Sequence, residues 1–176
     1  FGLSYEYMVT DNVGAAFAIG VPPTHTLTGT GILAPAGINP LATIKNWALP
    51  VLVKYHFRRW DSGFRPFVGG GVSYSWFTDE TVTPQFQQAL SLLLSSGATA
   101  VAPTTAKFGS KFSPIVSAGF TYPVAKAWGI VAELAYVPLK VTAKLQTYFG
   151  AGGVVASEGQ LTVNPVVFHF GVRHTF

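Results

Sequence analysis

The sequence predicts an all-β fold, an eight-stranded antiparallel transmembrane β-barrel in which seven strands are readable. Three observations indicate it. Apolar residues recur at alternate positions within short segments, and short and long connections alternate along the chain. Charged residues make up only 10% of the 176 residues, against about 25% in an average soluble domain. Because no run of about 18 apolar residues occurs, transmembrane helices are not expected.

Alternation and turn residues place the strands along the chain. We expect them at 1–9, 13–22, 48–59, 64–77, 112–123, 129–140 and 161–176. Short turns join some of them, whereas long segments rich in Thr, Ser, Gly, Ala and Pro lie at 23–47, 78–111 and 141–160. Short periplasmic turns and long outer loops are typical of outer-membrane barrels. The whole chain, 1–176, is therefore predicted to be a single outer-membrane barrel domain with long extracellular loops.

Each predicted strand has one apolar face and one small or charged face. In 48–59, Val51, Val53 and Tyr55 alternate with Lys54 and His56. Lipid would tolerate the first face but not the second, so the apolar face is expected to contact acyl chains. The terminal segment 166–176 follows the same pattern and ends on an aromatic residue.

The number of readable strands leaves the barrel one short. With seven antiparallel strands, the first and the last run in the same direction and cannot close an antiparallel barrel. Open strand edges are not tolerated in lipid. We therefore expect one further strand and its outer loop before Phe1, with parallel closure as the less favoured alternative.

Four segments carry a family resemblance, and together they cover nearly all the readable strands in order. The chain contains GLSYEYMVTDNVGAAFAIGVPPTH, PVLVKYHF, FRPFVGGGVSYSWF and NPVVFHFGVRHTF. It resembles the OmpW family of small outer-membrane proteins, which includes AlkL. The resemblance implies an eight-stranded barrel with a narrow hydrophobic channel, blocked toward the periplasm, that releases small apolar molecules sideways through its wall.

The resemblance also implies partners and marks two departures. Phe176 matches the aromatic end of the assembly signal read by the barrel-assembly machinery. Outer-membrane lipid, lipopolysaccharide and small apolar solutes are the other expected partners. The chain departs from the family pattern at His174, where Tyr is usual, and at Pro138 and Leu139, where an acidic residue is usual.

Inward-facing charged residues gather toward the predicted short-turn end of the strands. Unpaired charges in a narrow lumen are costly, so we expect ion pairs and hydrogen bonds among them. We predict that they form a polar plug on the periplasmic side; the alternative is simple filling of the barrel core. The plug residues are Glu6, Lys54, His56, Arg58, Arg65, Glu133, His169 and Arg173.

Small and apolar residues face inward above the plug, and they suit a hydrophobic solute better than a sugar or an ion. The alternative is tight packing without a cavity. The predicted hydrophobic channel wall consists of Leu52, Gly69, Gly71, Ser73, Ile115, Val131 and Val137.

Prolines within the strands indicate interruptions of the hydrogen-bond ladder, because proline has no amide donor. Pro114, Pro138 and Pro165 lie toward the outer ends, where they could shape a lateral opening or mark the exit of strands from the membrane. The segment PQFQQALSLLLSS places Phe86 and Leu90 at helical spacing with Leu93 and Leu94. It predicts a short helix that caps the channel mouth, touches the outer leaflet or packs the loop down, with a strand over 90–94 as the alternative.

Other function classes find little support. The chain has no cysteine, no metal-ligand motif and no basic run for nucleic acid, so no metal, cofactor or nucleic-acid partner is predicted. None of the four histidines is followed by Ser two residues later, so no enzyme is expected. We predict passive uptake of small hydrophobic molecules across the outer membrane. The alternative is a structural or receptor protein whose loops bind an extracellular partner or phage.

Overall fold

The computed structural model describes residues 1–29, 39–59, 63–94, 101–149 and 153–176 of the chain. Strands dominate it. They are β1 (Gly2–Met8), β2 (Val13–Gly20), β3 (Thr24–Leu27), β4 (Ala42–His56), β5 (Arg65–Val82), β6 (Thr104–Phe108), β7 (Lys111–Pro123), β8 (Trp128–Tyr136), β9 (Leu139–Tyr148), β10 (Val154–Val163) and β11 (Val166–His174). Helix α1 (Pro84–Leu94) follows β5. Within the described residues, no helix is both long and apolar enough to cross a membrane.

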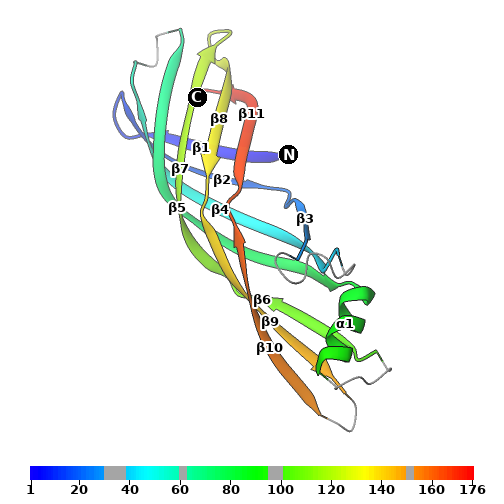
Figure 1. Cartoon of the computed structure of the whole chain (residues 1–176). Helices are drawn as coiled ribbons and strands as arrows, with labels where there is room; N and C mark the ends of the chain where they lie inside the picture. The colour runs from blue at the N-terminus through cyan, green and yellow to red at the C-terminus, as the bar shows by residue number, and fades with distance from the viewer. Residues whose placement is uncertain (30–38, 60–62, 95–100, 150–152) are drawn as a thin grey trace.

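The main sheet is antiparallel and curls into a half-barrel (Figure 1). Its hydrogen-bonded order is β1-β2-β4-β5-β7-β8-β11, and β3 pairs with Ala42–Lys45 at the start of β4. Throughout, 'upper' and 'above' mean away from the short turns, such as the turn between β7 and β8, which lies at the top of Figure 1. Every neighbouring pair is antiparallel, so β1 and β11, the two edges, run in the same direction. The equal direction of the first and last strands confirms the parity expected from the sequence. Antiparallel closure of this sheet requires one more strand between β1 and β11.

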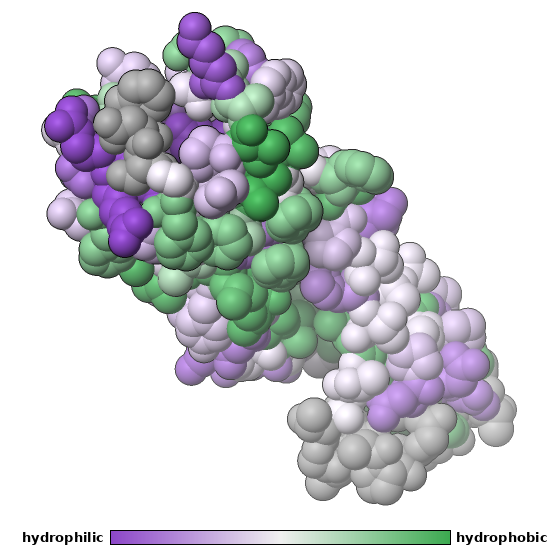
Figure 2. Space-filling view, turned by 90° about the horizontal axis from the view of Figure 1, so that it is seen from above, coloured by the Kyte–Doolittle hydropathy of each residue, from purple (hydrophilic) through white to green (hydrophobic). Residues whose placement is uncertain are grey.

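The outer face of the main sheet is a continuous apolar band. Figure 2 shows hydrophobic residues gathered over this part of the molecule. The part of the molecule that extends beyond the main band, which we call the projecting part, is paler and more hydrophilic. Exposed apolar area of this extent in water is unfavourable, so the band is the lipid-facing surface. Its residues include Leu3, Tyr5, Tyr7, Phe17, Ile19, Val51, Val53, Tyr55, Val68, Val72, Phe112, Val116, Leu134, Tyr136, Phe168, Phe170 and Val172.

A second sheet, of order β10-β9-β6, continues the wall beyond the band. Strands β8 and β9 form one long hairpin with β10 and β11: Tyr136 pairs with Val166, and Leu139 pairs with Val163 in the same register. Residues 137–138 and 164–165 interrupt it. The predicted strands 129–140 and 161–176 are therefore each divided in two, because Pro138 and Pro165 cannot donate ladder hydrogen bonds.

The three segments expected as long loops contain much regular structure, so the strands extend further than predicted, while the extracellular placement of these segments stays a prediction. The segment 23–47 includes β3 and the start of β4, 78–111 includes the end of β5, helix α1 and β6, and 141–160 includes most of β9 and β10. Residues 30–38, 95–100 and 150–152 of these segments lie outside the described residues. The strands continue because their alternation persists, although Thr, Ser and Ala replace the larger apolar residues.

Helix α1 begins where the sequence predicts it. Pro84 occupies the first helical position, which needs no amide donor, and Thr83 precedes it. The Thr83 hydroxyl donates to the carbonyls of Pro40 and Leu41, which ties the helix start to β4. Leu93, expected on the packed face, is 73% exposed instead. Residues 95 and 96 of the predicted helical segment lie outside the described residues.

Candidate functional site

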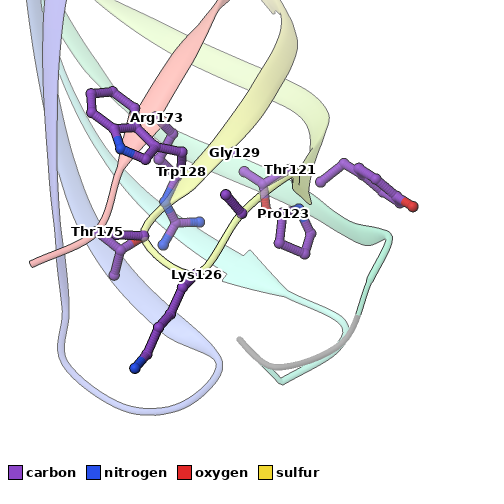
Figure 3. A pocket seen from close by; sticks show the side chains of 10 residues that line it. Thr121, Pro123, Lys126, Trp128, Gly129, Arg173 and Thr175 are labelled. Carbon is purple, nitrogen blue, oxygen red and sulfur yellow. The ribbon is translucent and has the colours of Figure 1, made fainter.

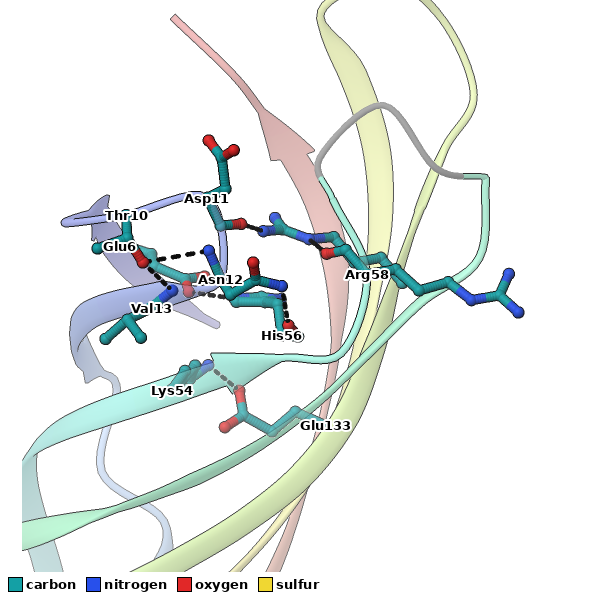
Figure 4. A network of polar contacts seen from close by, with 10 residues as sticks. Glu6, Thr10, Asp11, Asn12, Val13, Lys54, His56, Arg58 and Glu133 are labelled. Atoms are coloured by element: carbon teal, nitrogen blue, oxygen red, sulfur yellow. Dashed lines mark hydrogen bonds and ion pairs between the residues drawn. The ribbon is translucent and has the colours of Figure 1, made fainter.

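Two side-chain pairs, an ion pair and a histidine–carboxylate hydrogen bond, fill the half-barrel near its short-turn end, where β1 joins β2, β4 joins β5 and β7 joins β8. Lys54 Nζ lies 2.7 Å from Glu133 Oε2, with side-chain exposures of 9% and 12%. His56 Nε2 lies 2.6 Å from Glu6 Oε1, and the imidazole is fully buried. Figure 4 shows these side chains pointing inward from β4, β8 and β1. Alternation along each strand puts them on the inner face, and the sheet curvature brings them together.

An aromatic ring underlies both side-chain pairs. Phe67 of β5 is 2% exposed, and its ring centroid lies 4.6 Å from Lys54 Nζ and 5.2 Å from the His56 ring centroid. Gly119 of β7 is its register partner, and a Cβ there would lie 2.7 Å from Phe67 Cζ and 2.3 Å from the carbonyl oxygen of Ala132. Phe67 has the same parity in its strand as the predicted plug residue Arg65, but it was not among the predicted plug residues. An inward aromatic opposite a glycine is the signal that could have found it.

Arg65 ties the turns together beneath the two side-chain pairs. Its Nε donates to the carbonyl of Arg58 at 2.7 Å, and its Nη2 donates to the carbonyl of Asp11 at 2.6 Å. Asn12 Nδ2 donates to the carbonyl of His56 at 2.6 Å. These bonds connect the β1–β2 turn to the β4–β5 turn. Side chains that are fixed by hydrogen bonds between these strands therefore narrow the interior.

The remaining plug residues lie apart from this network. Arg58 contributes its carbonyl, but its side chain is exposed and points away from the network, which corrects its assignment (Figure 4). It lies beyond the end of β4, where alternation no longer fixes the face. His169 is the register partner of Glu133 and is half-buried. Arg173 lines a cavity of about 330 Å³ at the short-turn end, beside Trp128 and Thr175 (Figure 3).

Apolar residues form a layer directly above the plug. Leu52, Ile115 and Val137 are each at most 8% exposed and pack together, with Ala135 against them. Gly71 pairs with both Leu52 and Ile115, and Ser73, one step further up the same face, is 1% exposed. The structure therefore brings together most of the predicted channel wall.

Two predicted wall residues lie elsewhere. Gly69 lies at the level of the plug: a Cβ there would be 3.2 Å from Lys54 Cγ and 2.6 Å from Ser117 Oγ. Val131 pairs with Thr121 and Gly171, two residues below Glu133 toward the short-turn end. Its assignment to the upper wall is corrected, because alternation fixes the face of a residue but not its height.

The hydrogen-bond ladder between β7 and the next strand is interrupted from the level of this layer upward. The β7–β8 register ends at Val116 and Tyr136, and pairing resumes only between Phe108 of β6 and Ala143 of β9. Extending the β7–β8 register two steps places Pro114 opposite Pro138, so neither can donate across the seam. A weak bond crosses the interval, from Gly109 N to the carbonyl of Thr142 at 3.5 Å. We call this interval, 109–115 against 137–142, the wall gap.

A cavity of about 350 Å³ occupies the upper part of the wall gap. Lys107, Phe108, Gly109, Ser110, Lys111, Lys140, Val141, Thr142 and Lys144 line it. Pro165 lies on the other side of β8, where its carbonyl accepts from Val137 N at 3.2 Å and keeps the β8–β11 side joined. Of the three prolines predicted to shape an opening, Pro114 and Pro138 thus flank the wall gap, and Pro165 borders the joined side.

Aromatic side chains border the apolar band at its two ends. Tyr74, Trp76 and Phe112 contact one another near the upper end through the Tyr74 ring. At the short-turn end, the His174 ring centroid lies 4.6 Å from Trp128 and 4.7 Å from Phe176. His174, which stands where Tyr is usual, therefore packs within the aromatic girdle. Phe176 is exposed, and its role as an assembly signal stays a prediction.

A curved antiparallel sheet that is apolar outside, charged inside and bordered by aromatic girdles defines a protein of the outer-membrane β-barrel class. The OmpW family model matches residues 1–176, so the chain belongs to the OmpW family and is an outer-membrane protein. Outer membrane protein W of Vibrio cholerae is 27% identical over 176 residues, which cover 99% of this chain and 72% of that protein.

Solved structures show the same fold. The crystal structure of the outer membrane protein OprG from Pseudomonas aeruginosa has a TM-score of 0.79 at 23% identity, covering 99% of this chain and 76% of that chain. The solid-state NMR structure of the outer membrane protein AlkL in lipid bilayers has a TM-score of 0.64 at 21% identity, covering 98% and 70%.

Proposed function

We propose that the chain forms an outer-membrane channel for passive uptake of small hydrophobic molecules. In this proposal the plug blocks the axial route to the periplasm, and the solute leaves sideways through the wall gap into the membrane. The observation that carries the proposal is the coincidence of an interrupted ladder, two opposed prolines and an apolar interior layer at one height in the barrel wall.

The plug supports the axial block. Buried charges are stable only when they are paired and hydrogen-bonded; Lys54 is paired with Glu133, and Glu6 is bonded to His56 through Nε2. The Phe67 ring packs against Lys54 and His56, and Arg65 holds the turns below. Moving a solute along the axis at this level would require breaking these contacts in a low-dielectric interior. A sideways exit above the plug avoids that cost.

The wall gap supports the sideways exit. A lipid-embedded strand normally has its backbone groups paired, because each unpaired group in hydrocarbon costs several kcal/mol. Here two residues that lack amide hydrogens face each other, so the seam can stay open with fewer unpaired donors. The adjoining layer of Leu52, Ile115 and Val137 offers an apolar surface leading to it.

Passive transport agrees better than catalysis with the buried histidine. His56 Nε2 is bonded to Glu6, as in a catalytic pair, but its other ring nitrogen, Nδ1, has no hydrogen-bond partner among the described residues. A nucleophilic hydroxyl must be hydrogen-bonded to the histidine that activates it. The His56–Glu6 pair is therefore assigned a structural role in the plug.

The test is tracer uptake by cells with and without the full-length protein. We expect faster uptake of naphthalene or a medium-chain alkane, and unchanged uptake of a polar tracer of similar size. Ser73→Phe, which fills the inner face above the plug, should reduce the apolar rate to near that of cells lacking the protein. Val72→Phe is the matched control, because the neighbouring side chain is on the lipid face and 52% exposed.

Assembly is checked in parallel by the heat-dependent gel mobility of each variant, so that loss of the barrel is not taken for a blocked channel. Equal apolar uptake with and without the protein would contradict the proposal and favour a role for the outer loops in binding a partner or phage. Equal effects of Ser73→Phe and Val72→Phe, in assembled protein, would contradict an interior route.

A further inference from the structure

Four lysines surround the wall gap. They are Lys107 on β6, Lys111 at the start of β7, and Lys140 and Lys144 on β9, all exposed and all lining the 350 Å³ cavity. The chain has only three other lysines, Lys45, Lys54 and Lys126. More than half of the lysines are thus gathered at one opening, although charged residues are scarce in the chain.

Two of these lysines are placed unfavourably for the protein alone. Lys107 and Lys144 are direct register partners on β6 and β9, and like charges at directly opposed positions destabilise a sheet. Lys144 has one acidic neighbour, Glu158, at 3.9 Å, in an exposed pair worth little. Glu80, the other nearby carboxylate, accepts instead from Phe108 N at 2.8 Å. The cluster therefore keeps a net positive charge that an external anion would neutralise.

The height of the cluster matches a lipid headgroup. On β7, Phe112 is 69% exposed and is followed down the strand by exposed Val116, whereas Lys111 comes directly above Phe112. Along β8 and β9, Tyr136 is the last residue of the apolar band. Lys140 follows two residues after the interruption at 137–138. Charged residues begin where the apolar band ends, at the end of the barrel opposite the short turns. Short turns lie on the periplasmic side, so the cluster lies at the outer leaflet.

We propose that Lys107, Lys111, Lys140 and Lys144 bind the phosphate groups of a phosphorylated lipid of the outer leaflet, with the acyl chains along the exposed Phe112 and Val116. A headgroup with two phosphates neutralises the opposed Lys107 and Lys144 together and reaches across the wall gap to Lys111. The bound lipid lies at the rim of the lateral exit. The inference assumes the orientation and the wall gap of the proposed function, but it concerns lipid binding and needs no transported solute.

The experiment measures binding of a fluorescent diphosphorylated lipid A to the full-length protein in zwitterionic nanodiscs. Lys107→Gln/Lys144→Gln should weaken binding about 25-fold, because each lysine near an anionic surface contributes about five-fold. Lys45→Gln/Lys126→Gln is the matched control with the same loss of charge, and it should change binding less than two-fold. Raising the salt concentration should weaken binding to the unmodified protein more than to the Lys107→Gln/Lys144→Gln variant.

Several results would overturn the inference. Equal losses in the two double variants would show a general charge effect, and equal binding of a zwitterionic lipid would show that phosphate charge is not recognised. Complete competition by inorganic pyrophosphate at the concentration of lipid A would show an anion site without a lipid. If Lys107→Gln/Lys144→Gln does not assemble, Lys111→Gln/Lys140→Gln replaces it, with the same expected loss. A positive lipid result with no tracer uptake would reject the proposed channel but not this site.

Discussion

The lower and upper halves of β4, β5, β7 and β8 belong to the same strands, yet they are held together in different ways. Below, the ladder is continuous, the Lys54–Glu133 and His56–Glu6 pairs link strands across the interior, and the Phe67 ring packs against Lys54 and His56. Above, serine, glycine and small apolar residues line the inner face, and the ladder between β7 and its neighbour is interrupted at Pro114 and Pro138.

Under the proposed function, this difference closes the barrel along its axis and opens it through its wall. Both halves keep the alternation that lipid requires on the outside. The inner positions alone differ, with long charged or aromatic side chains below and short ones above. In that proposal, inward side chains account for the axial closure, and the backbone donors that proline removes account for the lateral opening.

Breaking the buried Lys54–Glu133 ion pair in the lower half should have the largest effect on the free energy of unfolding. Glu133→Gln leaves Lys54 buried without a counter-charge, which costs about 3 to 5 kcal/mol of unfolding free energy. Urea unfolding in lipid vesicles measures it. The double variant Lys54→Met/Glu133→Leu should recover part of the loss, because neither charge is then buried alone. A loss under about 1 kcal/mol in the single variant would contradict the buried pairing.

Crowding the packing beneath the ion pair should have the next largest effect. Gly119→Val places side-chain atoms against Phe67 and the Ala132 carbonyl, where even a Cβ would be 2.3 Å from that oxygen. We expect a loss of about 2 to 3 kcal/mol, typical of overpacking. Gly70→Val is the control, since nothing lies within 4 Å of a Cβ there. The same unfolding assay compares the two, and similar losses would contradict the contact with Phe67.

Restoring backbone amide donors at the wall gap should change transport more than it changes the free energy of unfolding. In Pro114→Val/Pro138→Val, new ladder hydrogen bonds worth about 1 kcal/mol each offset the gain in unfolded-chain entropy, so stability should stay within about 1 kcal/mol. Apolar tracer uptake should fall several-fold as the wall gap closes. Hydrogen exchange at residues 112–116 and 137–140 reports the closure. Slower exchange with undiminished uptake would place the exit elsewhere.

Breaking an exposed ion pair in the projecting part should have the smallest effect. Lys45 Nζ lies 2.6 Å from Asp79 Oδ2, a separation like that of Lys54 and Glu133, but the side chains are 43% and 64% exposed. Lys45→Gln should cost less than about 0.5 kcal/mol in the unfolding assay used for Glu133→Gln. A loss near that of Glu133→Gln would mean that burial does not distinguish the two pairs.

The sequence predicts the faces of the barrel well because alternation is local. Lys54, His56 and Glu133 were expected inside and are found in contact across strands. The height of a residue along the barrel axis is harder to predict, because it depends on the register between neighbouring strands. Val131 has the same parity as Glu133, yet the register through Thr121 places it level with Arg65, within the plug.

Two other outcomes follow from what local patterns cannot express. Alternation stops fixing the face beyond a strand end, so Arg58 was assigned inward although its side chain is exposed. The Thr-, Ser- and Ala-rich segments were read as loops, but β9 and β10 still alternate and pair over ten residues each. The prolines were singled out correctly as special, whereas the opposition of Pro114 and Pro138 emerges only from the register.

The most direct test of the lateral exit uses the absence of cysteine from the chain. Pro114→Cys/Pro138→Cys can be bridged across the wall gap by oxidation, and Ala118→Cys/Leu134→Cys can be bridged across the same two strands where the ladder is intact. The reduced Pro114→Cys/Pro138→Cys variant gains the same amide donors as Pro114→Val/Pro138→Val, so its apolar tracer uptake should already be several-fold lower. We expect bridging at 114 and 138 to reduce uptake further, to the level of cells without the protein, and reductant to restore only that lowered rate. Bridging at 118 and 134 should leave uptake unchanged. Full uptake through a protein bridged at 114 and 138 would contradict an exit between β7 and β8.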